Sequence, residues 1–84
     1  MSKKPYFLYM LLCSDKTLYT GITTDLERRV DEHNHSDKGA KYTKARRPVL
    51  LVYNEEHPDR STASKREYLI KKMSKKEKEV LINI

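Results

Sequence analysis

Three short apolar runs and several amphipathic stretches alternate along the 84-residue chain. The first run, Tyr6 to Cys13 (YFLYMLLC), is almost wholly apolar and lies between Pro5 and the polar residues 14–16. Such a run predicts a strand that is buried on both faces and is therefore central in its sheet. The second run, Leu18 to Thr23 (LYTGIT), follows at once. Together the two runs predict an antiparallel hairpin.

The register of this hairpin decides which of its tyrosines share a face of the sheet. Side chains alternate between the two faces of a strand, so Tyr9 and Tyr19 share a face only if paired residue numbers add up to an even value. A pairing of Cys13 with Thr17 across a short turn meets this condition. We therefore predict that register, because a slip of one residue would send Tyr19 to the opposite face.

A helix is expected directly after the hairpin. Thr24 or Thr23 can cap it, and acidic residues follow in its first turn, where the helix dipole favours them. Leu26 and Val30 lie four positions apart and form its core stripe. The helix is expected to end within residues 34–36, and the segment 37–47 then reads as a loop or a weak helix.

The C-terminal half predicts one more strand and two helices. The run Pro48 to Tyr53 is a third strand, and Asn54 to Asp59 is a polar turn. A helix should run from about Arg60 to Met73, and a capping box at Ser74 starts a last helix that ends near Asn83. The side chains expected to face the core from these helices are Ala63, Tyr68, Leu69, Met73, Val80 and Leu81.

The predicted order is β-β-α-(loop)-β-α-α. It corresponds to an α+β fold in which helices flank a three-stranded antiparallel sheet. We expect residues 1–84 to form a single domain, because a chain of this length is too short for two. A domain this small buries only roughly 60–65% of its unfolded surface, so its core must be thin.

Charge and cysteine content indicate which binding partners and which cellular compartment to expect. The chain carries 18 Lys and Arg against 12 Asp and Glu, a formal charge of +6. This favours polyanions, with nucleic acid first and an anionic membrane surface second; a well-charged surface without such a partner is the alternative. The single cysteine excludes an intrachain disulfide and favours a cytoplasmic location.

The N-terminus superficially resembles a signal sequence, because Lys3 and Lys4 precede the first apolar run. The run is short for that purpose and contains Tyr9, so a strand is the better interpretation. No stretch approaches the roughly 20 apolar residues that span a bilayer. We expect no membrane partner.

A basic segment around Gly39 is the first candidate for a binding surface. The segment could bind nucleic acid, through phosphate contacts and base stacking. Alternatively, it could be an ordinary solvated loop. The candidate nucleic-acid-binding residues are Lys38, Lys41, Tyr42, Lys44, Arg46 and Arg47.

An ordered set of residues carries the candidate chemistry. Phe7-Leu8-Tyr9 is followed by Tyr19-Thr20-Gly21, then by Arg29 with His33 four positions later, and finally by Glu67. This order and spacing resemble the GIY-YIG nuclease family, over most of the chain. The first motif departs from the family pattern, since Phe7 stands where a Gly would be. Such departures indicate a small single-domain bacterial branch of the family.

The resemblance implies a metal-dependent nuclease that hydrolyses DNA, at nicks, ends or branched structures, with a role in repair. It implies that Glu67 binds Mg²⁺ or Mn²⁺ and that Tyr9 orients or deprotonates the attacking water. Arg29 would clamp the phosphate, while Tyr19 and His33 would position water or phosphate. The helical spacing favours Arg29 over Arg28 for this role. Gly21 would let the backbone approach the substrate closely.

Plainer interpretations stay open for the same residues. Tyr9 could be a core aromatic, and Glu67 could form a surface ion pair with Lys71 on its helix. His33 and His35 lack the further ligands of a zinc site. For the whole chain, the alternatives are a nucleic-acid-binding module without catalysis and a protein-interaction domain, and fold resemblance alone does not decide between them.

Overall fold

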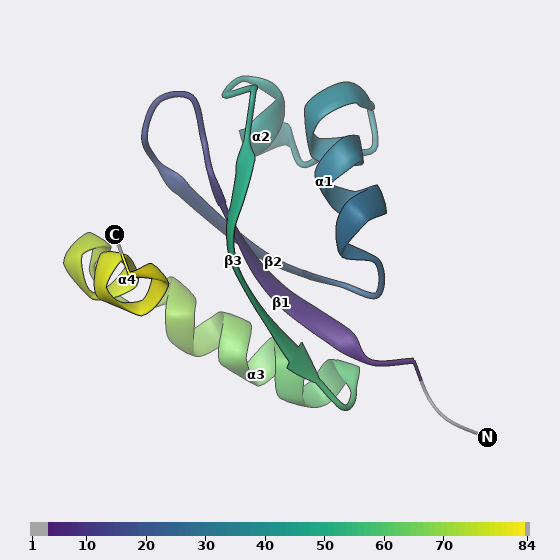
Figure 1. Cartoon of the computed structure of the whole chain (residues 1–84), viewed down its shortest axis with the longest axis vertical. Coiled ribbons are helices and arrows are strands. Elements are labelled where there is room, and N and C mark those ends of the chain that lie inside the picture. The colour runs from purple at the N-terminus through teal and green to yellow at the C-terminus, as the bar shows by residue number, and fades with distance from the viewer. Residues whose placement is uncertain (1–3, 84) are drawn as a thin grey trace.

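The computed structural model describes residues 4–83, so Lys3 of the basic N-terminus lies outside the described residues. The elements are β1 (Tyr6–Leu12), β2 (Leu18–Thr23), α1 (Leu26–His35), α2 (Lys41–Lys44), β3 (Leu50–His57), α3 (Arg60–Lys71) and α4 (Lys75–Ile82). The strands form an antiparallel sheet in the order β2-β1-β3 (Figure 1). The predicted α+β fold with a three-stranded antiparallel sheet is thus confirmed.

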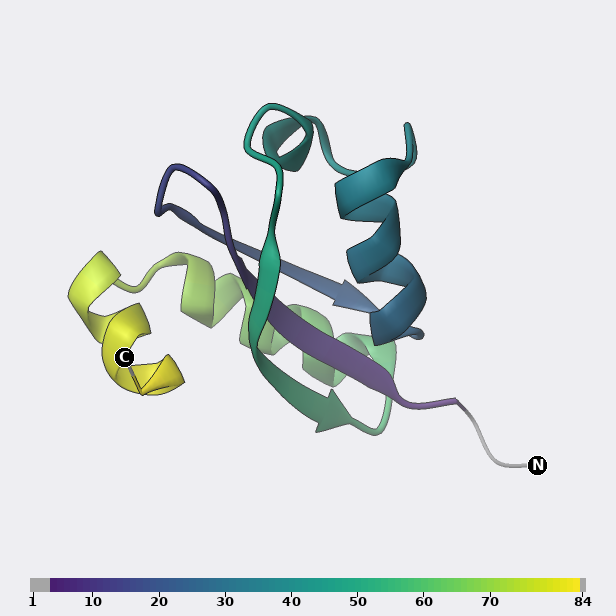
Figure 2. The same ribbon diagram turned by 45° about the horizontal axis from the view of Figure 1, so that its top comes forward.

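Strand β1 is central and is covered on both faces, as its apolar run predicted. Tyr9 and Leu11 pack on the face covered by α1, whereas Leu8 and Met10 pack with Ile70 of α3 on the other face. Figures 1 and 2 show the resulting three layers, with α1 and α2 on one side of the sheet and α3 and α4 on the other. Each face of β1 therefore supplies one half of a thin core.

The hairpin has the predicted register. Tyr9 pairs with Gly21, and the Cys13 N–H donates to the carbonyl of Thr17 at 2.9 Å across the turn. The paired numbers add up to an even value, and Tyr19 therefore lies on the same face as Tyr9.

Helix α1 begins slightly later than expected. Thr23 and Thr24 were both wrong as its cap, because the Asp25 carboxylate accepts from the Arg28 N–H at 3.0 Å. The Thr23 hydroxyl instead accepts from the Asp25 N–H at 3.1 Å. An Asp caps a helix as well as a Thr does, so composition alone could not separate these neighbouring candidates.

The predicted bounds of the third strand were also wrong. β3 runs from Leu50 to His57 and includes most of the segment expected to be a polar turn. Its polar residues pair with β1, where Phe7 lies opposite Glu56. Backbone pairing needs no apolar side chain, and a strand at the sheet edge can present polar residues to water.

A charged cluster ties β3 to α3. The Glu55 carboxylate accepts from the Arg66 guanidinium at 2.9–3.0 Å, from His57 at 3.0 Å and from the Tyr53 hydroxyl. Burial alone would raise the pKa of Glu55, but these hydrogen bonds outweigh it and lower the pKa to about 2. The cluster holds an edge strand whose own apolar contacts are few.

The inward face of α3 differs from the expected one. Ala63 and Ile70 are buried, but Tyr68 is 60% and Leu69 is 55% exposed. The inward stripe runs through buried Ala63 and Ile70 with the partly exposed Glu67 between them, because residues three and four apart share a helix face. The expectation that Tyr68 and Leu69 face the core was therefore wrong.

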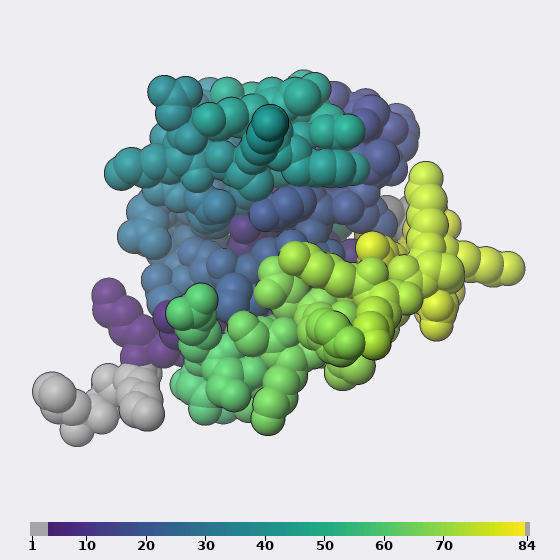
Figure 3. Space-filling view, turned by 180° about the vertical axis from the view of Figure 1, so that it is seen from behind, coloured from purple at the N-terminus to yellow at the C-terminus, as the bar shows by residue number. Residues whose placement is uncertain are grey.

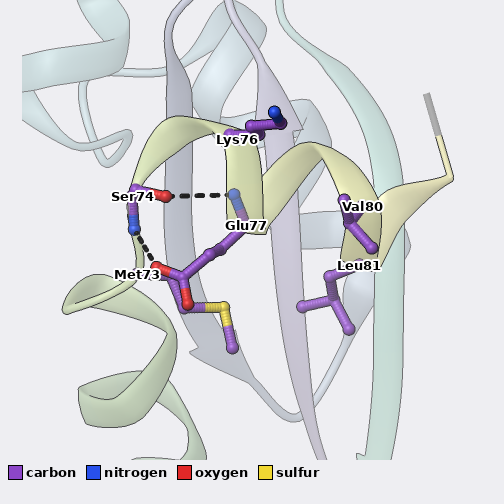
Figure 4. A pocket seen from close by; sticks show the side chains of 6 residues that line it. All are labelled: Met73, Ser74, Lys76, Glu77, Val80 and Leu81. Carbon is purple, nitrogen blue, oxygen red and sulfur yellow. Dashed lines mark hydrogen bonds between the residues drawn. The ribbon is translucent and has the colours of Figure 1, made fainter.

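Helix α4 starts at the predicted capping box. The Ser74 N–H donates to the Glu77 carboxylate at 2.9 Å, and the Glu77 N–H donates to the Ser74 hydroxyl at 3.1 Å (Figure 4). Leu81 packs on the core as expected, whereas Val80 is 74% exposed, contrary to expectation. No helix within residues 4–83 is long and apolar enough to cross a membrane.

The Glu55 cluster predicts a specific acid sensitivity. Its folded-state pKa of about 2 lies below its ordinary value of 4.5, so its contribution is complete above pH 4.5 and is lost as the pH falls towards 2. We expect Glu55→Gln to remove on the order of 2 kcal/mol of unfolding free energy at pH 7 and to flatten this part of the pH profile.

Denaturant unfolding followed by circular dichroism at several pH values measures both effects. Glu56→Gln is the matched control, because Glu56 is the exposed neighbour on the same strand. An unchanged pH profile in Glu55→Gln would show that the cluster does not stabilise the fold.

Candidate active site

The hydroxyl of Tyr9 lies at the centre of the candidate site. It is 2.8 Å from Nε2 of His33, which reaches it from α1. Tyr19 packs against both rings, with centroid distances of 6.5 Å to Tyr9 and 5.2 Å to His33. Three residues from three different elements thus meet on the sheet face that the hairpin register selects.

Gly21 provides the space for the Tyr9 phenol. A Cβ at this position would lie 2.5 Å from the Tyr9 hydroxyl oxygen and 2.7 Å from its ring. The ring therefore leans from β1 across its paired residue in β2. The space that we expected to admit a substrate at Gly21 is filled by Tyr9.

Arg29 joins this group from α1, as the helical spacing predicted. Its side chain is 25% exposed, against 59% for that of Arg28. Its guanidinium donates to the Glu32 carboxylate at 3.0 Å and to the Lys38 carbonyl at 2.8 Å, and it lies near enough to Tyr9 to affect the pKa of the phenol. A fixed cation thus lies beside the phenol.

The environment keeps both Tyr9 and His33 uncharged. Burial raises the pKa of Tyr9 to about 12, and the hydrogen bond from Arg29 only partly opposes this. Burial, together with the positive charge of Arg29, lowers the pKa of His33 to about 4. At neutral pH the pair is a phenol hydrogen-bonded to a neutral imidazole.

Glu67 approaches this pair from α3. Its carboxylate is partly exposed and lies 3.2 Å from the ammonium group of Lys71, so the surface ion pair considered above is present. Its negative charge nevertheless reaches Tyr9 and contributes to the raised pKa of that residue. Glu67 is therefore partly exposed and lies within electrostatic range of the Tyr9 hydroxyl.

The donor set around Glu67 limits which metals could bind. No group of three or more His, Cys, Asp and Glu side chains converges within residues 4–83. One partly exposed carboxylate suits Mg²⁺, which keeps several waters and takes one or two carboxylates together with substrate phosphate. His35 points away from His33 and pairs with Asp31 at 3.0 Å, so the two histidines do not form a zinc site.

The basic segment lies next to the site. Lys38, Lys41 and Lys44 are exposed, and Tyr42 stacks on Tyr19 with ring centroids 6.0 Å apart. In the view from behind, purple atoms of β1 are visible in a hollow below the teal and blue segments of α1 and α2 (Figure 3). The segment that carries the lysines therefore lies next to Tyr19 and the centre of the site.

The two arginines of this segment, Arg46 and Arg47, bond to other groups of the protein. Arg46 pairs with Asp15 at 2.9 Å and lies 3.8 Å from the centre of the Tyr42 ring. Arg47 donates to the carbonyls of His33 and Ser36, at 2.6 Å each, and so caps the C-terminus of α1. Basic composition alone could not separate these two side chains from the exposed lysines.

The sequence analysis missed one residue of the site altogether. The Thr43 hydroxyl lies 2.7 Å from Nδ1 of His33, on the side of the imidazole opposite Tyr9. A threonine in a basic loop does not by its residue type indicate a functional role, so only the three-dimensional contact with His33 identifies Thr43 as part of the site.

These features define a class of protein. Residues 5–80 match the family model described as the GIY-YIG catalytic domain. The match spans most of the chain, and the protein therefore belongs to the GIY-YIG family. The resemblance to the GIY-YIG family is thus confirmed as family membership.

The chain is similar to proteins grouped as UPF0213. It is 58% identical over 77 residues to the UPF0213 protein of Desulfotalea psychrophila, covering 92% of this chain and 70% of that one. It is 51% identical over 76 residues to the UPF0213 protein of Halobacterium salinarum, covering 90% and 97% of the two chains.

Two solution NMR structures resemble the fold. The UPF0213 protein BH0048 from Bacillus halodurans matches with a TM-score of 0.61 and 42% identity, over 94% of this chain and 83% of that one. The protein EF2693 from E. faecalis matches with a TM-score of 0.66 and 44% identity, over 98% and 86% of the two chains.

The contact between Tyr9 and Gly21 predicts a steric cost. Gly21 does not have a positive φ, so its backbone conformation permits alanine. We expect Gly21→Ala to lower the unfolding free energy by about 1–3 kcal/mol, because the added methyl group overlaps the phenol. Denaturant unfolding measures the loss.

A double-mutant cycle with Tyr9→Ala isolates this cause. Gly21→Ala should cost little once the phenol is gone, since the overlapping atoms are then absent. An equal loss in both backgrounds would assign the effect to the strand backbone.

Proposed function

We propose that this protein is a metal-dependent nuclease that hydrolyses phosphodiester bonds in DNA. The observation that supports this best is the 2.8 Å contact of the Tyr9 phenol with the His33 imidazole, with the Arg29 guanidinium and the Glu67 carboxylate both influencing the pKa of the phenol, within a GIY-YIG domain. Phosphodiester hydrolysis needs an activated water, a cation for the growing phosphate charge and help for the leaving oxygen.

Tyr9 and His33 provide a route for the proton of the attacking water. The water proton passes to the Tyr9 oxygen while the Tyr9 proton passes to Nε2 of His33, 2.8 Å away. The phenol thereby stays neutral, which its raised pKa favours. The charge that appears on His33 is compensated by the negative phosphate.

Arg29 and Glu67 provide the charges that the reaction needs. The guanidinium of Arg29 is held by Glu32 and Lys38 and can clamp a phosphate through its remaining donors. Glu67 would hold Mg²⁺ or Mn²⁺, releasing Lys71 towards solvent. When bound, such an ion lowers the pKa of a coordinated water and neutralises charge on the phosphate.

The exposed lysines define the expected substrate surface. Lys38, Lys41 and Lys44 would contact phosphates beside the stacked rings of Tyr19 and Tyr42. Such a short basic surface suits local features of DNA such as nicks, ends and branches, consistent with a role in repair. Arg46 and Arg47 would stabilise the segment that carries these lysines through their bonds to Asp15 and to the end of α1.

Cleavage assays with purified protein test the proposed function. We expect cleavage of nicked, branched, duplex or single-stranded DNA that requires Mg²⁺ or Mn²⁺ and stops with EDTA. Glu67→Gln and Arg29→Ala should each lower the rate by about 10²-fold or more, because each removes charge that acts on the transition state.

Neighbouring residues offer matched controls for this assay. Glu56→Gln and Arg28→Ala make the same charge changes at exposed positions and should leave the rate unchanged. Cleavage that survives both Glu67→Gln and Arg29→Ala would identify a contaminating nuclease and reject the site. Tight DNA binding without cleavage would instead support the alternative of a binding module.

The salt dependence of DNA binding tests the lysine surface. Lys41→Ala should reduce the slope of log K against log salt by about 1, because one phosphate contact and its released counterion are lost. Lys65→Ala, at an exposed position on α3, is the control and should not change the slope. Equal reductions would assign binding to net charge alone.

A further inference from the structure

We infer that Thr43 is a positioning residue, whose hydroxyl holds His33 in the tautomer that carries its proton on Nδ1 and leaves Nε2 free to accept from Tyr9. The catalytic consequence of this arrangement rests on the proposed function. The tautomer itself is a property of the protein without substrate and can be measured separately.

The hydrogen-bond chain assigns the proton positions. Thr43 and His33 are both fully buried, and the Thr43 hydroxyl oxygen lies 2.7 Å from Nδ1 of His33. That hydroxyl also donates to the Ala40 carbonyl at 2.9 Å. A hydroxyl has one proton, so towards His33 it can only accept, and Nδ1 must be the donor.

The opposite tautomer would leave a buried proton without a partner. Nε2 would then donate to the Tyr9 oxygen, and the Tyr9 proton would need another acceptor. Tyr9 is 1% exposed, and within residues 4–83 the acceptor within hydrogen-bond distance of its hydroxyl is His33, whereas the guanidinium of Arg29 can only donate. A buried hydroxyl without an acceptor is costly, which disfavours this tautomer.

One contact favours the opposite assignment but is weak. The Ala40 N–H lies 3.4 Å from Nδ1, a long distance for a hydrogen bond. The 2.7 Å contact to Thr43 is far shorter and lies between fully buried groups. The charged groups near the imidazole, which are Arg29 and Glu32 on α1 and Arg47 before β3, set its pKa but do not bond to either ring nitrogen.

The local fold holds Thr43 in this position. A Cβ on Gly39 would lie 2.6 Å from the Glu32 carbonyl and 2.9 Å from Cα of His33, so the loop lies directly against α1. The single turn of α2 then carries Thr43 inward, while its neighbour Tyr42 stacks on Tyr19. The basic segment therefore supplies a buried support for the imidazole as well as exposed lysines.

The tautomer decides whether the proposed proton transfer can begin. With Nδ1 protonated, Nε2 accepts the Tyr9 proton as the Tyr9 oxygen takes one from water. The resulting imidazolium keeps its Nδ1–H on Thr43, so both ring protons remain partnered. With Nε2 protonated, His33 could only donate to Tyr9, and the transfer would have no acceptor.

Nitrogen-15 NMR of the histidine side chains tests the tautomer directly. In wild-type protein, long-range ¹H–¹⁵N spectra near neutral pH should show Nδ1 of His33 protonated and Nε2 unprotonated. Thr43→Val, which keeps the shape without the hydroxyl, should shift His33 towards the Nε2–H form. Thr43→Ser should restore the wild-type pattern.

Thr20→Val is the matched control. Thr20 is also buried, but its hydroxyl has no hydrogen-bond partner among the described residues, so this change should not affect the His33 tautomer. A wild-type His33 with Nε2 protonated, or a Thr43→Val variant that keeps Nδ1 protonated, would overturn the inference. The wild-type spectrum decides this even if a variant fails to fold.

Kinetics test the catalytic consequence. On the DNA that the wild type cleaves fastest, Thr43→Val should lower kcat at least about tenfold with KM little changed, and Thr43→Ser should recover most of it. An unchanged kcat together with a changed tautomer would overturn the positioning role. If the wild-type protein cleaves no DNA, the proposed function and the catalytic part of this inference fail together, while the spectra still decide the tautomer.

Discussion

The pairing of Tyr9 with Gly21 is the constraint on which the rest of the structure depends. β1 is buried on both faces, so a slip of one residue would exchange its two sets of core side chains. The same slip would separate Tyr9 from Tyr19 and from His33. Gly21 must lie opposite Tyr9 for a second reason, since any larger residue would overlap the phenol. Folding and site assembly therefore share a single register.

This arrangement produces a site that is neutral inside and positive around its rim. Burial pushes the pKa of Tyr9 up and that of His33 down, so the central hydrogen bond joins two uncharged groups. Arg29 and the lysines of the basic segment surround it with positive charge. In the proposed reaction, a bound phosphate would compensate both the positive charge of Arg29 and the lysines and the charge of a proton transferred to the imidazole.

The sequence predicted those features that follow from periodicity and from order along the chain. The buried central strand, the hairpin register and the choice of Arg29 over Arg28 all follow from which positions share a face. The bounds of β3 could not be predicted in this way, because its C-terminal part is polar and is held to α3 by the contact between Glu55 and Arg66. The outward position of Leu69 likewise depends on how α3 is rotated against the sheet, which its own apolar residues do not fix.

The basic segment shows most clearly why residue type was insufficient to predict which of its residues support the site. Its lysines are exposed, whereas Arg47 closes the last turn of α1 and Thr43 holds the imidazole that this turn carries. By composition alone, all of these residues belong to a single polar, positively charged loop. Their roles separate only because the loop returns to the end of α1, through contacts between residues 10 to 14 positions apart in the sequence. Thr43 and Arg47 bond to the ring and to the backbone of His33, so a displacement of the loop would break contacts that position the imidazole.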